Sequence, residues 1–134
     1  MEPSPADERE TAYDLLQRGE ELLRRRHHAQ AAIVLERANR LEPHRQSILE
    51  ALGRAYFNSG QHELSRRTFI ELLELEPSAH YAHYALGQSL KRLGRPSEAR
   101  THLKLAVALS PRTALYRQAL ARLPGPKPEP DPDG

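Results

Sequence analysis

The chain has 134 residues, of which 38% are apolar and 28% are charged, and it contains no cysteine. A length below about 150 residues favours a single domain, and the lack of cysteine excludes disulfides, thiolate metal sites and cysteine nucleophiles. The low apolar fraction and high charged fraction favour a thin layer of helices over a thick core of sheets and helices. We therefore expect an elongated all-α protein.

Charge is distributed unevenly along the chain. Residues 1–14 carry a net charge of −4 and residues 124–134 carry −2, so the middle carries +8 within a formal total of +2. This basic body could favour an acidic partner, or its own acidic ends could screen it. The first residues form no apolar signal segment, and no run of about 18 apolar residues follows, so we expect a cytoplasmic protein with no membrane partner.

The N-terminal extension, residues 1–11, is expected to lead into the first helix. Ser4 followed by Pro5, with Asp7 and Glu8 in the next turn, indicates a helix start that lengthens this first helix.

A repeat of 34 residues follows. Gly19, Gly53 and Gly87 recur at this interval. Other positions recur in phase with them: Pro43, Pro77 and Pro111; Ala31, Ser65 and Ala99; Leu35, Phe69 and Leu103; Leu41, Leu75 and Leu109. Such a period indicates three copies of one structural unit. The units cover residues 12–45, 46–79 and 80–113.

Each unit has the pattern of two helices. In the second copy one apolar helix face ends before a turn at Asn58, Ser59 and Gly60, and a second apolar face follows up to Leu75. The proline that closes each unit disfavours a helical residue before it. A glycine opposite Ala31, Ser65 or Ala99 allows the two helices to approach closely.

The last unit is followed by a different pattern. Residues 114–123 place Tyr116, Ala119, Leu120 and Leu123 on one helix face, which predicts a helix that caps the apolar end of the repeat stack. Residues 124–134 alternate proline with polar residues and are expected to form a disordered acidic tail. This tail could also fold back on the basic body and compete with partners.

Residues for catalysis or metal binding are scarce. The chain has no Gly-rich phosphate loop and no H-E-x-x-H motif, and among its histidines only His80 and His83 form a helical i, i+3 pair. A zinc site needs more ligands than this pair offers, so we interpret His83 as a packing residue in the place of Leu15 and Leu49. We expect no catalytic residue, no metal and no cofactor.

Arginine is abundant, but its charge is locally compensated. Acidic residues one helical turn earlier are suited to pair with it, at Glu20 and Arg24, Glu21 and Arg25, Glu36 and Arg40, and Glu63 and Arg67. A nucleic-acid face needs a continuous basic stripe with stacking aromatic residues. The scattered remaining basic residues do not indicate a nucleic-acid partner.

The segments LGRAYFNSGQHELSRRTFIELLELEP and LGQSLKRLGRPSEARTHLKLAVALSP resemble the tetratricopeptide repeat (TPR) family in spacing and in the placement of small residues. The resemblance covers residues 12–113. It implies an all-α, right-handed α-α superhelix, or TPR solenoid, of three helix-turn-helix repeats with a capping helix. It also implies a non-enzymatic adaptor or scaffold whose concave groove binds a peptide or helix of another protein. Arg18 departs from the leucine that is usual before the glycine, which predicts looser packing in the first copy.

Register with the family predicts the groove residues. They are Tyr13, Leu16, Glu20, Leu23 and Arg24 in the first copy, Ser47, Glu50, Arg54, Phe57 and Asn58 in the second, and Tyr81, Tyr84, Gln88, Lys91 and Arg92 in the third. Four of these, Tyr13, Phe57, Tyr81 and Tyr84, lie off the repeating apolar face, and we interpret them as ligand contacts rather than packing residues. Tyr13 and Phe57 could instead cover the seams between repeats.

Two further expectations concern function. In one TPR subtype a clamp of Lys or Arg and Asn binds the C-terminal carboxylate of a chaperone; the aligned residues here are Leu16, Glu20, Arg54, Tyr84 and Gln88, so we do not expect a clamp. The alternative to a peptide-binding adaptor is a homo-oligomeric scaffold that assembles through the capping helix or the tail.

Overall fold

The computed structural model describes residues 10–125, and the expectations for residues 1–9 and 126–134 lie outside this range. Seven helices and no strand occupy the described residues. They are α1 (Ala12–Arg24), α2 (His28–Leu41), α3 (Gln46–Asn58), α4 (His62–Leu75), α5 (His80–Arg92), α6 (Pro96–Leu109) and α7 (Ala114–Arg122). The expected fold class, a solenoid of three helix pairs with a final helix, is confirmed.

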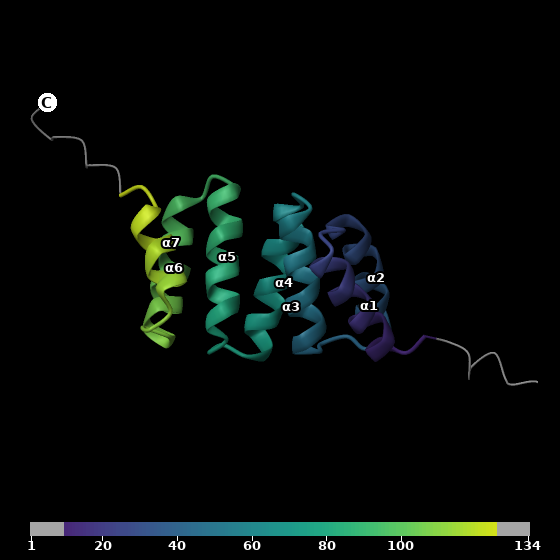
Figure 1. Cartoon of the computed structure of the whole chain (residues 1–134). Helices are drawn as coiled ribbons and strands as arrows, with labels where there is room; N and C mark the ends of the chain where they lie inside the picture. Colours follow the sequence, from purple (N-terminus) through teal and green to yellow (C-terminus); the bar gives the residue numbers. More distant parts are fainter. Residues whose placement is uncertain (1–9, 126–134) are drawn as a thin grey trace, which may run out of the picture.

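The helices stack side by side, so that the described chain begins at one end of the molecule and finishes at the other (Figure 1). Each helix contacts its successor, and α3 also contacts α1 and α5. Because the first helices of successive pairs touch one another, they line the concave side of the stack. The second helices form its outer layer.

The first helix begins later than the sequence suggested. Thr11 caps α1, with its hydroxyl accepting from the Asp14 backbone N–H and the Asp14 carboxylate accepting from the Thr11 backbone N–H. This capping box satisfies two N–H groups that the helix itself leaves unpaired. Glu10 and Thr11 are not helical, so the expected continuous extension of the first helix toward the N-terminus is wrong, and Ser4 itself lies outside the described residues.

The turn inside each helix pair has the same backbone geometry. Arg26, Gly60 and Gly94 lie 34 residues apart and have φ angles of 64°, 82° and 75°. Each turn also carries the two backbone hydrogen bonds of a Schellman motif, such as His27 N to Leu22 O at 2.8 Å and Arg26 N to Leu23 O at 3.0 Å. Left-handed backbone favours glycine, so Arg26 is the unusual residue of the three.

The glycines within the first helices permit close packing, as expected. A Cβ atom added at Gly53 would lie 2.6 Å from the Phe69 ring, and one at Gly19 would lie 2.5 Å from Leu35. The space beside each glycine is thus filled by a large side chain of the second helix: Leu35, Phe69 or Leu103. Ser65, one of the small residues expected opposite a glycine, donates a hydrogen bond to the Gly53 carbonyl at 3.2 Å.

The C-terminal helix covers the last repeat. Tyr116, Ala119 and Leu123 of this segment are buried, and the latter two belong to the same core cluster as Leu86, Leu90 and Leu103. The helix therefore closes the apolar end of the third pair, which confirms its role as a cap.

Candidate functional site: an aromatic pocket in the concave groove

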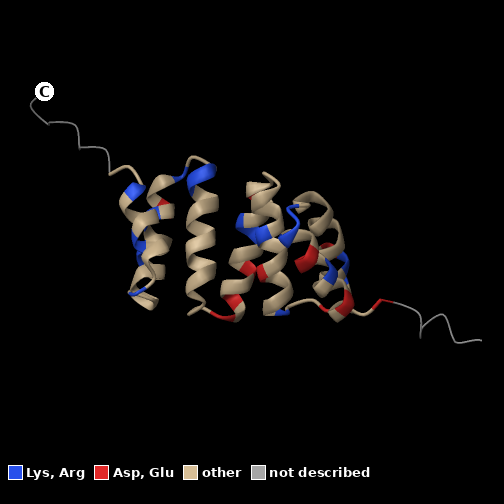
Figure 2. Cartoon of the chain, in the orientation of Figure 1, with Lys and Arg blue, Asp and Glu red and all other residues tan. Residues whose placement is uncertain are grey.

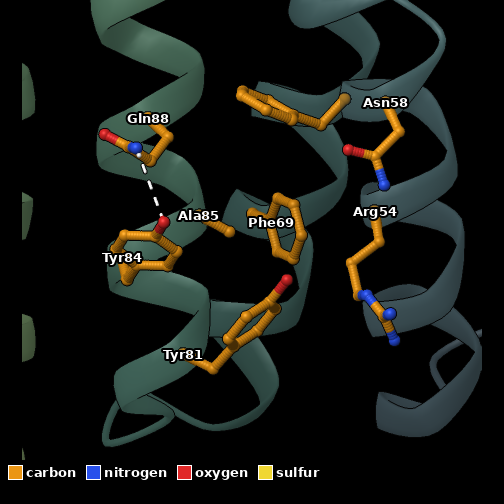
Figure 3. A pocket seen from close by; sticks show the side chains of 8 residues that line it. Arg54, Asn58, Phe69, Tyr81, Tyr84, Ala85 and Gln88 are labelled. Carbon is orange, nitrogen blue, oxygen red and sulfur yellow. Dashed lines mark hydrogen bonds between the residues drawn. The ribbon is translucent and has the colours of Figure 1, made fainter. Parts of the chain in front are cut away.

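A pocket of about 150 Å³ opens between the second and third helix pairs. The side chains around it come from three helices and are drawn in Figure 3. They are Arg54, Phe57 and Asn58 of α3, Phe69 of α4, and Tyr81, Tyr84, Ala85 and Gln88 of α5. Four aromatic side chains and one exposed cation thus line the same small space.

Buried hydroxyl groups link the three helices that line the pocket. Ser65 of α4 donates to the Gly53 carbonyl of α3 and accepts from the Ser89 hydroxyl of α5, whose Oγ lies 2.9 Å away. The Ala85 carbonyl oxygen of α5 also lies 2.9 Å from Ser89 Oγ and competes for the single Ser89 hydrogen. Both serine residues are fully buried, and buried polar groups stabilise a fold when they are hydrogen-bonded in this way. These contacts therefore stabilise the packing of α3, α4 and α5 against one another.

Aromatic rings continue from the pocket to the capping helix. The ring centroids of Phe69 and Tyr81 are 6.2 Å apart, those of Tyr81 and Tyr84 are 6.0 Å apart, and those of Tyr84 and Tyr116 are 5.1 Å apart. Separations of this size are typical of favourable aromatic pairs. The interpretation that Tyr81 and Tyr84 have no packing role is therefore wrong, because each is partly buried against the core while one face lines the pocket.

Tyr81 is a neutral side chain in this pocket, and two arginine side chains lie at the rim. Burial raises the pKa of Tyr81 to about 12, with the positive charge of Arg54 acting in the opposite direction. The Tyr81 hydroxyl therefore remains a hydrogen-bond donor at neutral pH. Arg54 is exposed, and the Arg92 guanidinium carbon lies 5.9 Å from the centre of the Phe57 ring, within the range of cation–π attraction.

Six of the predicted groove residues meet in this pocket: Arg54, Phe57, Asn58, Tyr81, Tyr84 and Gln88. Lys91 and Arg92 are exposed at the end of α5. Figure 2 shows this basic upper end of α5. Glu50 lies in a neighbouring hollow that it shares with Tyr81 and His80. Ser47 is exposed near the start of α3.

The groove residues of the first repeat lie elsewhere. Tyr13 is 65% exposed and its hydroxyl accepts from Gln17 at 2.6 Å. Leu23 is buried in the core, so its expected groove-facing role is wrong. Leu16 is partly buried and packs against the same core, and its groove-facing role stays a prediction. Glu20 is partly buried, and Arg24 donates to Glu21 rather than to Glu20, the partner that the sequence predicted.

Sequence reasoning missed two walls of the pocket. Phe69 occupies the register position of Leu35 and Leu103, and Ala85 occupies a buried position of α5. An aromatic ring at a position that is leucine in both other copies was the available signal for Phe69. Ala85 carried no such signal.

The predicted ion pairs are confirmed in part. Arg25 lies 3.0 Å from Glu21 and Arg67 lies 3.3 Å from Glu63. Glu36, the expected partner of Arg40, accepts instead from the Tyr56 hydroxyl at 2.9 Å. Burial and this hydrogen bond raise the pKa of Tyr56.

The two histidines of the i, i+3 pair, His80 and His83, have separate partners. His80 Nδ1 lies 2.7 Å from the Tyr116 hydroxyl, while His83 is buried and its Nε2 lies 2.8 Å from the Pro77 carbonyl oxygen. The expectation that His83 occupies a packing position is thus confirmed. Between residues 10 and 125 no group of three or more His, Cys, Asp or Glu side chains could hold a metal ion. None of the described helices is long and apolar enough to span a membrane.

Comparison with known proteins agrees with this architecture. The sequence profile of the tetratricopeptide repeat matches residues 16–66 and 50–114. The chain belongs to the tetratricopeptide repeat family. It is 31% identical over 94 residues to the mouse Superkiller complex protein 3, a match that covers 70% of this chain and only 6% of that much longer protein.

Solved structures with the same fold include peptide complexes. The first TPR domain of Spaghetti (RPAP3), bound to the HSP90 peptide SRMEEVD, matches with a TM-score of 0.80 and 16% identity over 84% of this chain and 90% of that one. YrrB, a TPR protein with an unusual peptide-binding site, gives 0.79 and 21% over 83% and 57%. The Yersinia enterocolitica secretion chaperone SycD, in complex with a YopD peptide, gives 0.72 and 16% over 83% and 85%. At these identities the match shows the fold alone.

Proposed function

We propose that this protein is a non-enzymatic adaptor that binds a peptide or helical segment of a partner protein in its concave groove. The observation that carries the proposal is the pocket between the second and third repeats, where Phe57, Tyr81 and Tyr84 surround a volume of about 150 Å³. An engineered apolar cavity of about this volume binds benzene. The pocket is therefore large enough for one bulky apolar side chain of a partner.

The rim of the pocket favours an acidic residue beside that apolar anchor. Arg54 lines the pocket on the side of Tyr81, and Arg92 lies over Phe57. The Arg54 and Tyr81 side chains extend toward each other at the edge of the pocket (Figure 3). A carboxylate placed between them would accept from both, and charge-assisted hydrogen bonds of this kind are stronger than neutral ones.

The family supports a binding role of this type. Two of the structures with the same fold, RPAP3 and SycD, contain bound peptides. Aromatic and arginine side chains in a desolvated centre are also the residue types that contribute most to binding at protein interfaces. The absence of a carboxylate clamp, expected from Leu16, Glu20, Tyr84 and Gln88, favours an internal segment of the partner over its C-terminus.

Selection from a library of random dodecamer peptides tests the proposal. Peptides selected on the full chain should share a bulky apolar residue with an acidic neighbour and bind with micromolar affinity. Phe57→Ala and Arg54→Glu should each weaken binding at least about tenfold, since each removes a wall or a rim charge of the pocket. Tyr13→Ala and Arg24→Glu, the matched groove changes in the first repeat, should leave binding unchanged. Equal binding by all four variants would contradict the proposal, provided that circular dichroism shows each to be folded.

One observation favours the alternative of a homo-oligomeric scaffold. Leu115 of the capping helix is 50% exposed, so this side chain is available to contact a second copy. Light scattering at high protein concentration should then give a mass above 15.2 kDa that Leu115→Glu returns to the monomer value. A monomer mass for the unmodified chain would remove this alternative and leave the adaptor proposal standing.

A further inference from the structure

Two histidine rings meet edge to edge between the helices of the third repeat. His83 of α5 and His102 of α6 have their Nδ1 atoms 3.1 Å apart, with 19° between the ring planes. The ring centres are 5.4 Å apart, so the two nitrogens point at each other across the gap. His83 is buried and His102 is partly buried.

The backbone determines where the hydrogens of this pair lie. His83 Nε2 is 2.8 Å from the Pro77 carbonyl oxygen, which can only accept, so Nε2 carries a hydrogen. In a neutral His83 ring the Nδ1 atom is then bare and accepts the hydrogen carried by His102 Nδ1. One hydrogen therefore lies between the two rings.

This arrangement accommodates one added proton but not two. A proton added at His102 Nε2 leaves every hydrogen bond in place. A second proton would have to bind His83 Nδ1, and two hydrogens would then face each other across 3.1 Å while two like charges lay side by side. In the unfolded chain both rings are separate and each titrates near pH 6.5, as an ordinary histidine does.

The surroundings of the pair contain few opposing charges. The rings border an apolar hollow of about 270 Å³ on the opposite side of α5 from the aromatic pocket, with Ile70, Leu73 and Leu86 among its walls. Three carboxylates lie in this region: Glu74 of α4 borders the hollow, Glu98 of α6 is paired with Arg95 at 2.7 Å, and Glu76 accepts from Ser78. Burial lowers the pKa of His102, as does His83, while Glu98 acts in the opposite direction.

We propose that His83 and His102 form a pH-sensitive latch that joins α5 to α6 at neutral pH and opens when both rings are protonated. Below about pH 6.5 the unfolded third repeat takes up two protons on this pair, but the closed repeat takes up only one. Stability therefore falls as the pH falls, and the equilibrium constant for opening rises about tenfold per pH unit below about pH 6. Because Tyr81 and Tyr84 lie on the same helix, opening of the latch also disrupts the aromatic pocket.

Hydrogen exchange measured by mass spectrometry on the full chain tests the latch. After correction for the intrinsic pH dependence of exchange, peptides of α5 and α6 should exchange about tenfold faster at pH 5.0 than at pH 6.0, whereas peptides of α1 and α2 should change much less. His83→Leu should strongly reduce this difference, leaving only the part that comes from the burial of His102, and leucine stands at the same register position in both other repeats, at Leu15 and Leu49. His27→Gln, which removes an exposed histidine of the first repeat, serves as the control and should behave like the unmodified chain.

Two results would overturn the proposal. One is protection of α5 and α6 that does not change between pH 6.0 and pH 5.0 in the unmodified chain. The other is an unchanged pH dependence in both His83→Leu and His102→Thr, a change that copies Thr68 of the second repeat. Should His83→Leu fail to fold, NMR titration of the imidazole signals in the unmodified chain decides, because two independent titrations near pH 6.5 would contradict a shared proton. The latch acts on the stability of the third repeat whether or not the groove binds a peptide.

Discussion

The first and third repeats share a backbone but differ in what they offer to a partner. Tyr13 and Tyr81 occupy the same register position, yet Tyr13 is 65% exposed whereas Tyr81 is partly buried and lines the pocket. The difference lies in the preceding helix. Tyr81 packs against Phe69 of the repeat before it, while the described residues place no helix before α1. A pocket in this solenoid therefore needs two adjacent repeats.

Side-chain size adds to this difference. At the register position of Tyr84 the first repeat carries Leu16, which packs against the core, and at that of Gln88 it carries Glu20. In the first repeat these apolar residues thus pack against the core, whereas in the third repeat aromatic rings line the groove. The frame that both share is set by the glycines and by the Schellman turns.

The largest expected effect tests how much the third repeat depends on its cap. The Tyr116 ring is 3% exposed, contacts Tyr84 and forms a hydrogen bond with His80 through its hydroxyl. Because Tyr116→Ala removes all of these contacts, it should lower the free energy of unfolding by about 3 kcal/mol. Urea denaturation monitored by circular dichroism measures the change. An effect below about 1 kcal/mol would mean that the cap and the third repeat are not one cooperative unit.

The next effect tests whether the frame is equivalent in the repeats. Gly19→Ala and Gly53→Ala place a Cβ atom 2.5 Å from Leu35 and 2.6 Å from Phe69, so each should destabilise the protein by about 1–3 kcal/mol through overpacking. The same urea titration compares the two variants. A neutral result at Gly19 alone would support the looser packing that Arg18 predicted for the first repeat.

The smallest effect concerns the turn inside each helix pair, where the repeats share the backbone geometry but differ in the residue at the left-handed position. Arg26→Gly relieves left-handed backbone at φ 64° and should stabilise the protein by about 0.5–1 kcal/mol, because glycine adopts this conformation without a steric penalty. Gly94→Ala, the reverse change at φ 75°, should destabilise by a similar amount. Thermal unfolding of both variants provides the measurement; melting temperatures that move in the same direction would contradict the shared turn geometry.

The fold could be predicted from the sequence because the 34-residue repeat assigns all three helix pairs at once. Most of the pocket could also be predicted, since Arg54, Tyr81 and Gln88 follow from the register of this repeat once the resemblance to the family assigns the groove to the first helices. The start of α1 was misassigned because Ser4 followed by Pro5 and the pair Thr11 and Asp14 are both good helix starts, and local patterns do not choose between them.

The contact between His83 and His102 could not be predicted from the register. It joins two helices across 19 residues, and the positions equivalent to His102 carry Val34 and Thr68, so no repeated pattern marks it. The packing of Tyr81 on Phe69 was missed for a related reason, since it depends on the neighbouring repeat and not on either helix alone.

The most direct test of the groove places a photocrosslinking benzoylphenylalanine at one of two positions in the full chain. Asn58 lines the aromatic pocket, and Ile33 is 62% exposed on α2, outside it. With a dodecamer selected on the unmodified protein, the Asn58 variant should form the crosslinked product and the Ile33 variant should not. Crosslinking from Ile33 with none from Asn58 would contradict the claim that the pocket between the second and third repeats holds the partner.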